Sequence, residues 1–217
     1  MRRTKEEAAN TRAAIVDAAL RCFDRHGIAS STLEQIACEA GVSKGAIYHH
    51  FEGKQQILRA IREQLTLPLL DEADTALLHA GDIPALERVE RFLLGMLESL
   101  EQDPRRRCAL SVMLFKCEYV GELEEELAGW RRNNDRLVKA FEAAYNHARA
   151  GGEMARCIDP RAAAVETLMF FAGAMRVWLL DNRRAGLRKE ARSAIVTHVR
   201  CRASSSAATS PARRGCG

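Results

Sequence analysis

Apolar residues recur at three- and four-residue spacing along almost the whole chain of 217 residues. This spacing places apolar side chains on one stripe of an α-helix, whereas a half-buried strand would alternate apolar and polar residues. Strict alternation is absent, β-branched residues are sparse, and no internal repeat is present. The pattern therefore predicts an all-α protein.

The first quarter of the chain is predicted to form short helices separated by clear start and stop signals. Gly27 is expected to end the first helix, and Gly41 the second. Thr32 and Gln35 have the spacing of a capping box, and Ser43 can cap a third helix. The expected helices cover about residues 11–25, 33–40 and 44–50, and a fourth begins near Lys54.

Longer helices are predicted beyond Gly81. Asp-Pro pairs at 103–104 and 159–160 open two of them, because proline is tolerated in the first turn of a helix. Pro68 is expected to end or kink the fourth helix. These later helices cover about residues 82–100, 103–119, 121–150, 159–180 and 187–201, which brings the expected total to about nine.

Residues 32–51 read TLEQIACEAGVSKGAIYHHF: a short helix, a glycine turn and a Ser-capped second helix. This is the pattern of a DNA-reading helix-turn-helix. Ala37 lets the two helices approach closely, and Gly41 permits the tight reversal between them. Ile47 and Phe51 lie one turn apart and are expected to pack inward. The outward side of the second helix is then small enough to enter a major groove.

Several residues of this segment are candidates for contact with DNA. Lys44 can make a charged contact with phosphate or guanine, Tyr48 can hydrogen-bond a phosphate, and His49 can touch base edges. Thr32 and Lys54 stand at helix N-termini, where free amides and the helix dipole favour an anion. The alternative is a packing module with a merely solvated polar side, but the outward face carries no acid. The candidate DNA-binding residues are Thr32, Ser43, Lys44, Gly45, Ala46, Tyr48, His49, His50 and Lys54.

The overall charge of the chain does not itself support DNA binding. The formal net charge is +4, but residues 183–217 hold nine basic residues and one acid. The first 182 residues therefore carry a net negative charge. The case for DNA binding must come from local geometry.

Composition narrows the class of protein. Hydrophobic residues make up 47% and charged residues 29%, as in soluble globular proteins. No apolar run has the length of a membrane span, and the first residues lack the apolar core of a secretory signal, so we expect a cytoplasmic protein without membrane association. The seven cysteines are scattered without a CxxC pair, which argues against a disulfide framework or zinc site.

The helix-turn-helix closely resembles that of the TetR family. Residues 42–51 read VSKGAIYHHF, and the reading helix of that family ends in a very similar string; His49 departs from the Trp or Tyr usual in close relatives. A looser resemblance to the AcrR-type branch, which represses multidrug efflux genes, comes from KCEY at 116–119, RVWLL at 176–180 and LRKEA at 187–191. The resemblance implies a homodimer on a palindromic operator, released by a small hydrophobic or cationic inducer.

The C-terminal half is expected to dimerise and to bind the inducer. In residues 167–180 only Thr167 and Arg176 are polar, and a helix apolar on all sides must be covered on all sides, here by a second copy of the chain. Glu118 and Glu166 are candidate partners for a cation, although an ion pair within the protein is the alternative. The candidate ligand-binding residues, which could equally be ordinary core, are Met96, Met113, Cys117, Glu118, Trp130, Phe141, Glu166, Met169 and Phe170.

The expected organisation follows from these assignments. Residues 1–53 form the helix-turn-helix DNA-binding domain of three helices, residues 54–202 the larger helical ligand-binding and dimerisation domain, and residues 203–217 a disordered tail. Phosphate loops and hydrolase or protease signatures are absent, so we expect no enzyme, cofactor or metal. A DNA-binding regulator without a small-molecule ligand, and an activator rather than a repressor, are the alternatives.

Overall fold

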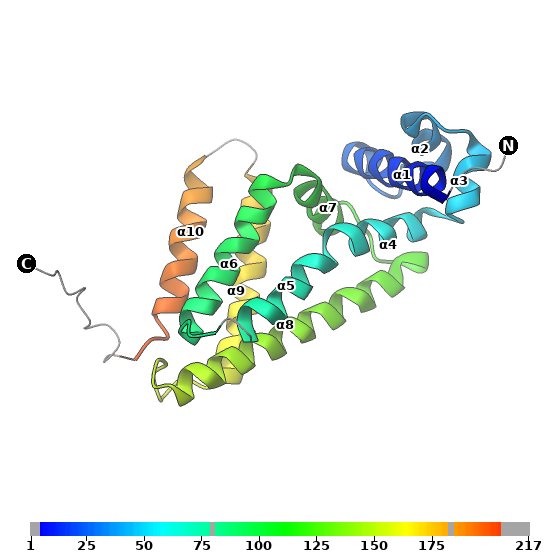
Figure 1. The fold of residues 1–217 in the computed structure, drawn as a ribbon. Helices are drawn as coiled ribbons and strands as arrows, with labels where there is room; N and C mark the ends of the chain where they lie inside the picture. Colours follow the sequence, from blue (N-terminus) through cyan, green and yellow to red (C-terminus); the bar gives the residue numbers. More distant parts are fainter. Residues whose placement is uncertain (1–4, 79–80, 182–184, 205–217) are drawn as a thin grey trace, which may run out of the picture. The chain divides into compact units, whose positions relative to one another are not determined.

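The computed structural model describes residues 5–78, 81–181 and 185–204, and within them the protein is all-α, as predicted (Figure 1). The helices are α1 (Lys5–His26), α2 (Leu33–Ala40), α3 (Lys44–His50), α4 (Lys54–Leu65), α5 (Leu67–Leu78), α6 (Ala85–Gln102), α7 (Pro104–Phe115), α8 (Glu124–Ala150), α9 (Pro160–Leu180) and α10 (Ala185–Arg200). A single 3-10 turn, Gly121–Leu123, precedes α8. The extended residues Met154 and Ala203 form an isolated antiparallel bridge.

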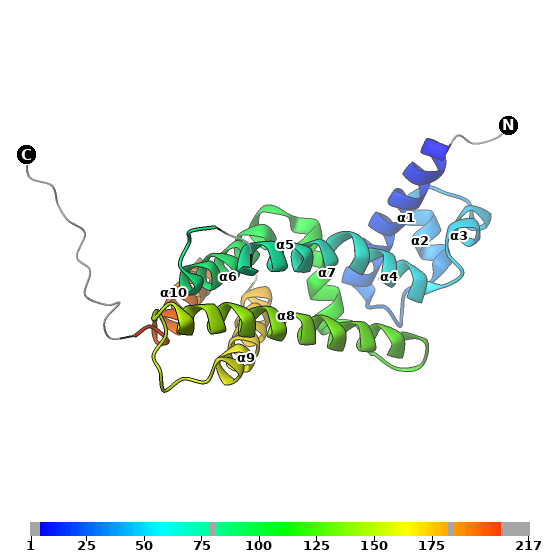
Figure 2. The same cartoon turned by 60° about the horizontal axis from the view of Figure 1, so that its bottom comes forward.

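The chain divides into two compact units, and each unit consists of two segments that are separated in the sequence. The first consists of residues 1–69 and 99–131, and the second of residues 70–98 and 132–217. The first unit therefore contains α4 and α7 in addition to the three N-terminal helices. Figure 2 shows α8 as one uninterrupted helix, and its residues are shared between the two units.

The core of the first unit is built around α1, which packs against α2, α4 and α7. Ile15, Ala19 and Phe23 lie on one stripe of α1 and are fully or almost fully buried. Ile36 of α2 and Ile47 of α3 join them. Each such large apolar side chain stabilises the fold by about 1.5–3 kcal/mol when it leaves water. This core fixes the helix that faces DNA in the predicted function.

In the second unit, α10 packs against α9, and the buried aromatic ring of Phe92 from α6 meets that of Phe141 from α8 edge-on at 5.8 Å. The turn after α8 also holds the start of α6. The carboxylate of Glu153 accepts hydrogen bonds from the backbone amides of Ala85 and Leu86, at 3.0 and 2.9 Å. These two amides have no partner inside the helix, so Glu153 serves as a cap from outside.

The structure departs from the predicted helix boundaries at the fourth helix. This helix ends at Leu65, and Thr66 turns the chain while its hydroxyl donates to the carbonyl of Arg62 at 2.8 Å. The next helix begins at Leu67, so Pro68 stands in a first turn, where its missing N–H costs nothing. The described residues thus form ten α-helices where about nine were expected.

The ends of the chain also differ from expectation. The first helix begins at Lys5, before the predicted start at Thr11. Within the predicted tail, the amide of Ser204 donates to the carbonyl of Glu153 at 2.7 Å, so the ordered chain continues past residue 203. Residues 205–217 of that predicted tail lie outside the described residues.

Candidate DNA-binding surface and ligand-binding residues

The turn between α2 and α3 has the geometry that the sequence predicts. Thr32 accepts from the amide of Gln35 at 3.1 Å, and the side chain of Gln35 accepts from the amide of Thr32 at 2.9 Å, which completes a capping box. Gly41 adopts a left-handed conformation with φ +66°, which non-glycine residues rarely adopt. Ser43 then caps α3 by accepting from the amide of Ala46 at 3.2 Å.

The two faces of α3 differ sharply in exposure. Ile47 and the following Phe51 are buried and anchor the helix to the core of the first unit. On the opposite side, Tyr48 is 50% exposed and is therefore available for contact with a partner. Of the other predicted contacts on this helix and its cap, Ser43, Lys44, Gly45 and His49 are exposed, and Ala46 and His50 are half-buried.

An acid lies beside the predicted reading face, contrary to expectation. Lys44 forms an ion pair with Glu34 of α2, and its ammonium also lies 5.9 Å from the centre of the Tyr48 ring. The hydrogen bond that Lys44 donates to the carboxylate of Glu34 raises the pKa of Lys44 and so favours its charged form. Both side chains are more than half exposed, so the pair exchanges readily with a stronger anion. A DNA phosphate near Lys44 would compete with Glu34.

Lys54 has a structural role that the sequence did not reveal. Its ammonium donates to the carbonyls of Ile28, Ala29 and Ser31 at 2.7, 3.0 and 2.9 Å. The ammonium is therefore engaged within the protein, and only the backbone amide at the start of α4 keeps the predicted geometry for a phosphate. Gly53 caps α4 without a side-chain hydrogen bond.

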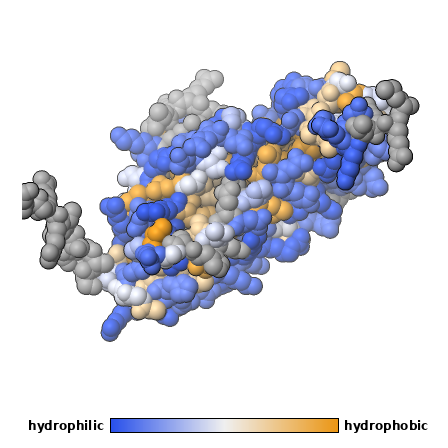
Figure 3. All heavy atoms as spheres, in the orientation of Figure 1, coloured by the Kyte–Doolittle hydropathy of each residue, from blue (hydrophilic) through white to orange (hydrophobic). Residues whose placement is uncertain are grey.

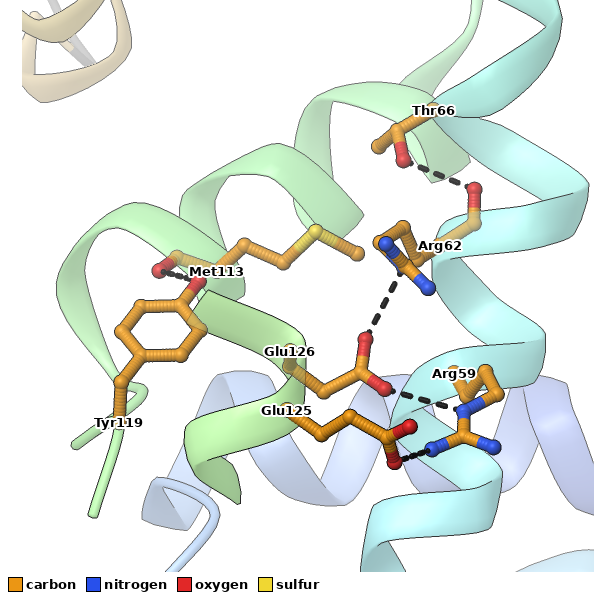
Figure 4. A network of polar contacts seen from close by, with 7 residues as sticks. All are labelled: Arg59, Arg62, Thr66, Met113, Tyr119, Glu125 and Glu126. Carbon is orange, nitrogen blue, oxygen red and sulfur yellow. Dashed lines mark hydrogen bonds and ion pairs between the residues drawn. The ribbon is translucent and has the colours of Figure 1, made fainter. Parts of the chain in front are cut away.

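A buried ion-pair network connects α4 to the start of α8 within the first unit (Figure 4). The carboxylate of Glu126 is almost completely buried and lies 3.1 Å from Arg59 Nε and 3.0 Å from Arg62 Nε. The contact with Arg59 is a hydrogen bond, whereas the contact with Arg62 lacks hydrogen-bond alignment and acts through charge alone. Arg59 also reaches the exposed Glu125.

The same network explains a glycine in α8. A Cβ atom added at Gly129 would lie 2.0 Å from Nη1 of Arg62. A side chain at this position would therefore displace the guanidinium from its present place. Sequence reasoning missed the network, because its members lie on helices far apart in the chain and read separately as ordinary charged residues.

Four of the predicted ligand-binding residues belong to the first unit. Met113 is buried in its core, and Trp130 is half-buried against that core. The half-buried Cys117 has its thiol pKa raised to about 11 by burial, so it is not a reactive thiolate. Glu118 is exposed and lines a cleft of about 260 Å³ together with Ile28 and other residues.

The other five belong to the second unit and have different surroundings. Phe141 is core, Phe170 stacks on the ring of His198 at 4.1 Å, and Glu166 forms an ion pair at 3.0 Å with the buried Arg202. For Glu166 the structure thus shows the ion pair that was the alternative to a ligand contact. Met169 is 70% exposed on α9, and Met96 lines a cleft beside α6.

Two family models match the chain. One describes bacterial regulatory proteins of the TetR family and matches residues 15–61, and the other describes the C-terminal region of MAATS-type transcriptional repressors and matches residues 84–201. The chain belongs to the TetR family. The described residues thus place the helix-turn-helix of this regulator at the segment where the family model predicts it.

Relatives of this TetR family regulator are themselves transcriptional regulators. It is 32% identical over 193 residues, 88% of each chain, to the regulator AcrR of Shigella flexneri. It is 35% identical over 182 residues to the repressor BepR of Brucella suis biovar 1 (strain 1330), which covers 82% of this chain and 85% of BepR. The branch predicted from the sequence is therefore confirmed.

Solved structures agree with this assignment. NalD, the secondary repressor of the MexAB-OprM multidrug efflux pump of Pseudomonas aeruginosa, superposes with a TM-score of 0.81 at 25% identity, covering 93% of this chain and all of NalD. SmeT, solved as a complex with triclosan, gives a TM-score of 0.78 at 25% identity, covering 96% and 98%. Members of this family bind operator DNA as dimers and respond to small molecules.

The outer face of α9 is exposed in the single chain and combines large apolar side chains with the charged Glu166 and Arg176. Met169, Val177 and Leu180 are 70%, 53% and 62% exposed. Among the described helices, α9 is the one whose length and composition would also suit a membrane span, but a core helix passes the same test.

Thr167 on the inner face of α9 is buried and hydrogen-bonds Tyr145 at 2.7 Å and His198 at 3.0 Å. Sequence reasoning missed this polar contact between α8, α9 and α10.

Proposed function

We propose that the regulator is a cytoplasmic repressor that binds a palindromic operator as a homodimer and is released by a small inducer. By analogy with its relatives, it controls a multidrug efflux transporter. The observation that carries this function is the outward face of α3, where Tyr48 and His49 are exposed on a helix whose other side is anchored in the core. We infer no enzymatic activity.

The exposed side of α9 supports the homodimer. The exposed apolar side chains of Met169, Val177 and Leu180 would be covered by the same face of a second copy, as two-fold symmetry requires. Two reading helices would then contact two half-sites about one helical turn, or a multiple of it, apart. Both reading helices must fit their half-sites at the same time. An inducer that favours a different distance between the two helices therefore weakens binding of the dimer to the operator. A coupling of about 1–3 kcal/mol corresponds to about 5- to 150-fold weaker binding.

Fluorescence anisotropy with the regulator's own upstream DNA tests the operator contacts. We expect Tyr48→Ala and His49→Ala to weaken binding to that DNA, with much less effect on a shuffled duplex. His26→Ala is the matched control, because His26 is exposed at the end of α1 and lies outside the predicted reading face. Equal affinity of wild-type protein for both duplexes would contradict the proposal.

Analytical ultracentrifugation tests the dimer separately. Met169→Lys replaces the most exposed apolar side chain of the proposed interface with a charge and should shift the protein towards monomer. Val120→Lys is the control, because Val120 is similarly exposed but belongs to the first unit. If both variants sediment as the wild type does, the outer face of α9 is not the interface.

The alternative function, a DNA-binding regulator without a small-molecule ligand, is tested by thermal shift. Triclosan, which SmeT binds, and the lipophilic cation tetraphenylphosphonium are suitable first probes. Stabilisation by either supports a sensor, whereas complete indifference to a broad panel favours the alternative.

A further inference from the structure

A cleft in the second unit combines apolar walls with arginine. It has a volume of about 260 Å³ and lies beside α6, with Ile83, Phe92, Gly95 and Met96 among its walls. Gly95 contributes to the opening, because a Cβ atom added there would meet nothing within 4 Å. The polar residues that line the cleft are Arg88 and Arg91.

Arg88 is held in place but retains donors for a ligand. Its Nη1 donates to the carbonyl of Leu77 at 2.9 Å, which fixes the guanidinium. Its Nε is buried and has no hydrogen-bond acceptor among the described residues. A guanidinium carries five N–H donors, and buried donors are normally paired. After a small movement of this side chain, a ligand could supply the missing hydrogen-bond acceptor for Nε.

The charge of the cleft favours an anion. Arg91 pairs with Glu87 one turn earlier on α6, and both side chains are largely exposed, so this pair lies at the solvent edge. Glu87 is not among the residues that line the cleft, and none of the described lining residues is acidic. The lining therefore combines two guanidinium groups, of which only Arg91 is paired with an acid within the described part of the chain, with aromatic, aliphatic and thioether side chains.

We propose that this cleft binds a small amphipathic anion: one or two fused rings that carry a carboxylate or phenolate. Its volume lies just below the usual range for ligand pockets, which limits the ligand to that size. The rings would lie against Phe92 and Met96, whose thioether adapts to varied apolar shapes. The anionic group would bind Arg88, since a guanidinium can hold a carboxylate with two parallel hydrogen bonds. The inference rests on the proposed function, because it names a ligand class for the sensor.

Three probes with the same ring system test the class: 2-naphthoate, 2-naphthamide and 2-naphthylmethylammonium. Isothermal titration of the full-length protein should give the tightest binding for the carboxylate and the weakest for the cation. Arg88→Met keeps an apolar stem of similar length and should weaken naphthoate binding about tenfold or more, with little change for the amide. Arg149→Met, an exposed position on α8, is the control and should change neither.

Filling the cleft provides a second, independent test. In Gly95→Leu the added side chain has space, and leucine favours a helix more than glycine does, so the fold should be retained. Binding of naphthoate should then be lost while circular dichroism is unchanged. Unaltered binding to both Arg88→Met and Gly95→Leu, or no preference for the carboxylate over the cation, would overturn the proposal.

The operator assay separates this inference from the proposed function. If ligand-free protein binds its own upstream DNA but shows no naphthoate binding, the inference fails and the repressor remains. If naphthoate binds at the cleft but the protein shows no preference for its upstream DNA, the proposed function fails and the site remains.

Discussion

Removing the carboxylate of Glu126 should be one of the most damaging single changes in the first unit. The group is 3% exposed and faces two guanidinium groups, of which Arg62 is 14% exposed at its side chain. Glu126→Ala would leave the charge of Arg62 without a counter-ion in a poorly solvated place. Breaking a buried ion pair in this way costs about 3–5 kcal/mol. Because Arg59 is accessible to water, which can solvate it in the variant, we expect about 3 kcal/mol.

Urea unfolding followed by circular dichroism measures this loss at one fixed protein concentration, since a dimer's midpoint depends on concentration. Glu125→Ala is a sharp control, because Glu125 precedes Glu126 directly, binds the same Arg59, and is 72% exposed. Its removal should cost about 0.5 kcal/mol or less, as for exposed ion pairs. A further variant, Arg62→Met with Glu126→Leu, removes both charges of the buried pair and should recover most of the stability. Equal midpoints for the Glu125 and Glu126 variants would refute the reasoning.

Three further outcomes follow from the local geometry. Ser43→Ala removes the cap of α3, and should cost about 1 kcal/mol in urea unfolding and weaken operator binding. Gly41→Ala forces a Cβ atom into a left-handed turn with φ +66°, and should cost about 1 kcal/mol although the site has space, whereas Gly95→Ala should stabilise. Burial, and secondly the charge of Arg202, lower the pKa of His198 to about 4 from 6.5. Protonation therefore favours the unfolded chain, and the thermal midpoint should fall as pH decreases from 6.5 towards 4, less steeply in His198→Phe; equal slopes for both proteins would contradict this.

The helices were predictable wherever local chemistry sets the boundary. Thr32 with Gln35, Gly41 and Ser43 each act on the residues beside them, so the bounds of α2 and α3 match expectation. The break between α4 and α5 at Thr66 was not predictable, because Leu65 and Leu67 on either side of it continue the apolar pattern of a helix up to Pro68. A proline was a plausible stop, but it can equally occupy the first turn of a new helix, as it does here.

The site residues likewise divide into those whose surroundings are set by nearby sequence and those whose surroundings depend on contacts between helices. Exposure of Tyr48 and burial of Ile47 follow from helical spacing, which a single segment contains. The pairing of Lys44 with Glu34 and of Glu166 with Arg202 depends on which helices meet, and spacing within one helix carries no such information. For that reason the exposure of Tyr48 and His49 was predictable, whereas the predicted ligand residues have surroundings as different as a core, an ion pair and an exposed face.

Lys54 gives the turn after α1 a mechanical property. Three backbone carbonyls of that turn accept hydrogen bonds from the ammonium group of Lys54 at the start of α4. Opening the turn would therefore leave three carbonyls and a cation without their partners. The segment that leads into the helix-turn-helix and the helix that follows it are thereby joined through one side chain, that of Lys54. A displacement of Lys54 at the first turn of α4 would therefore pull directly on the segment that precedes α2.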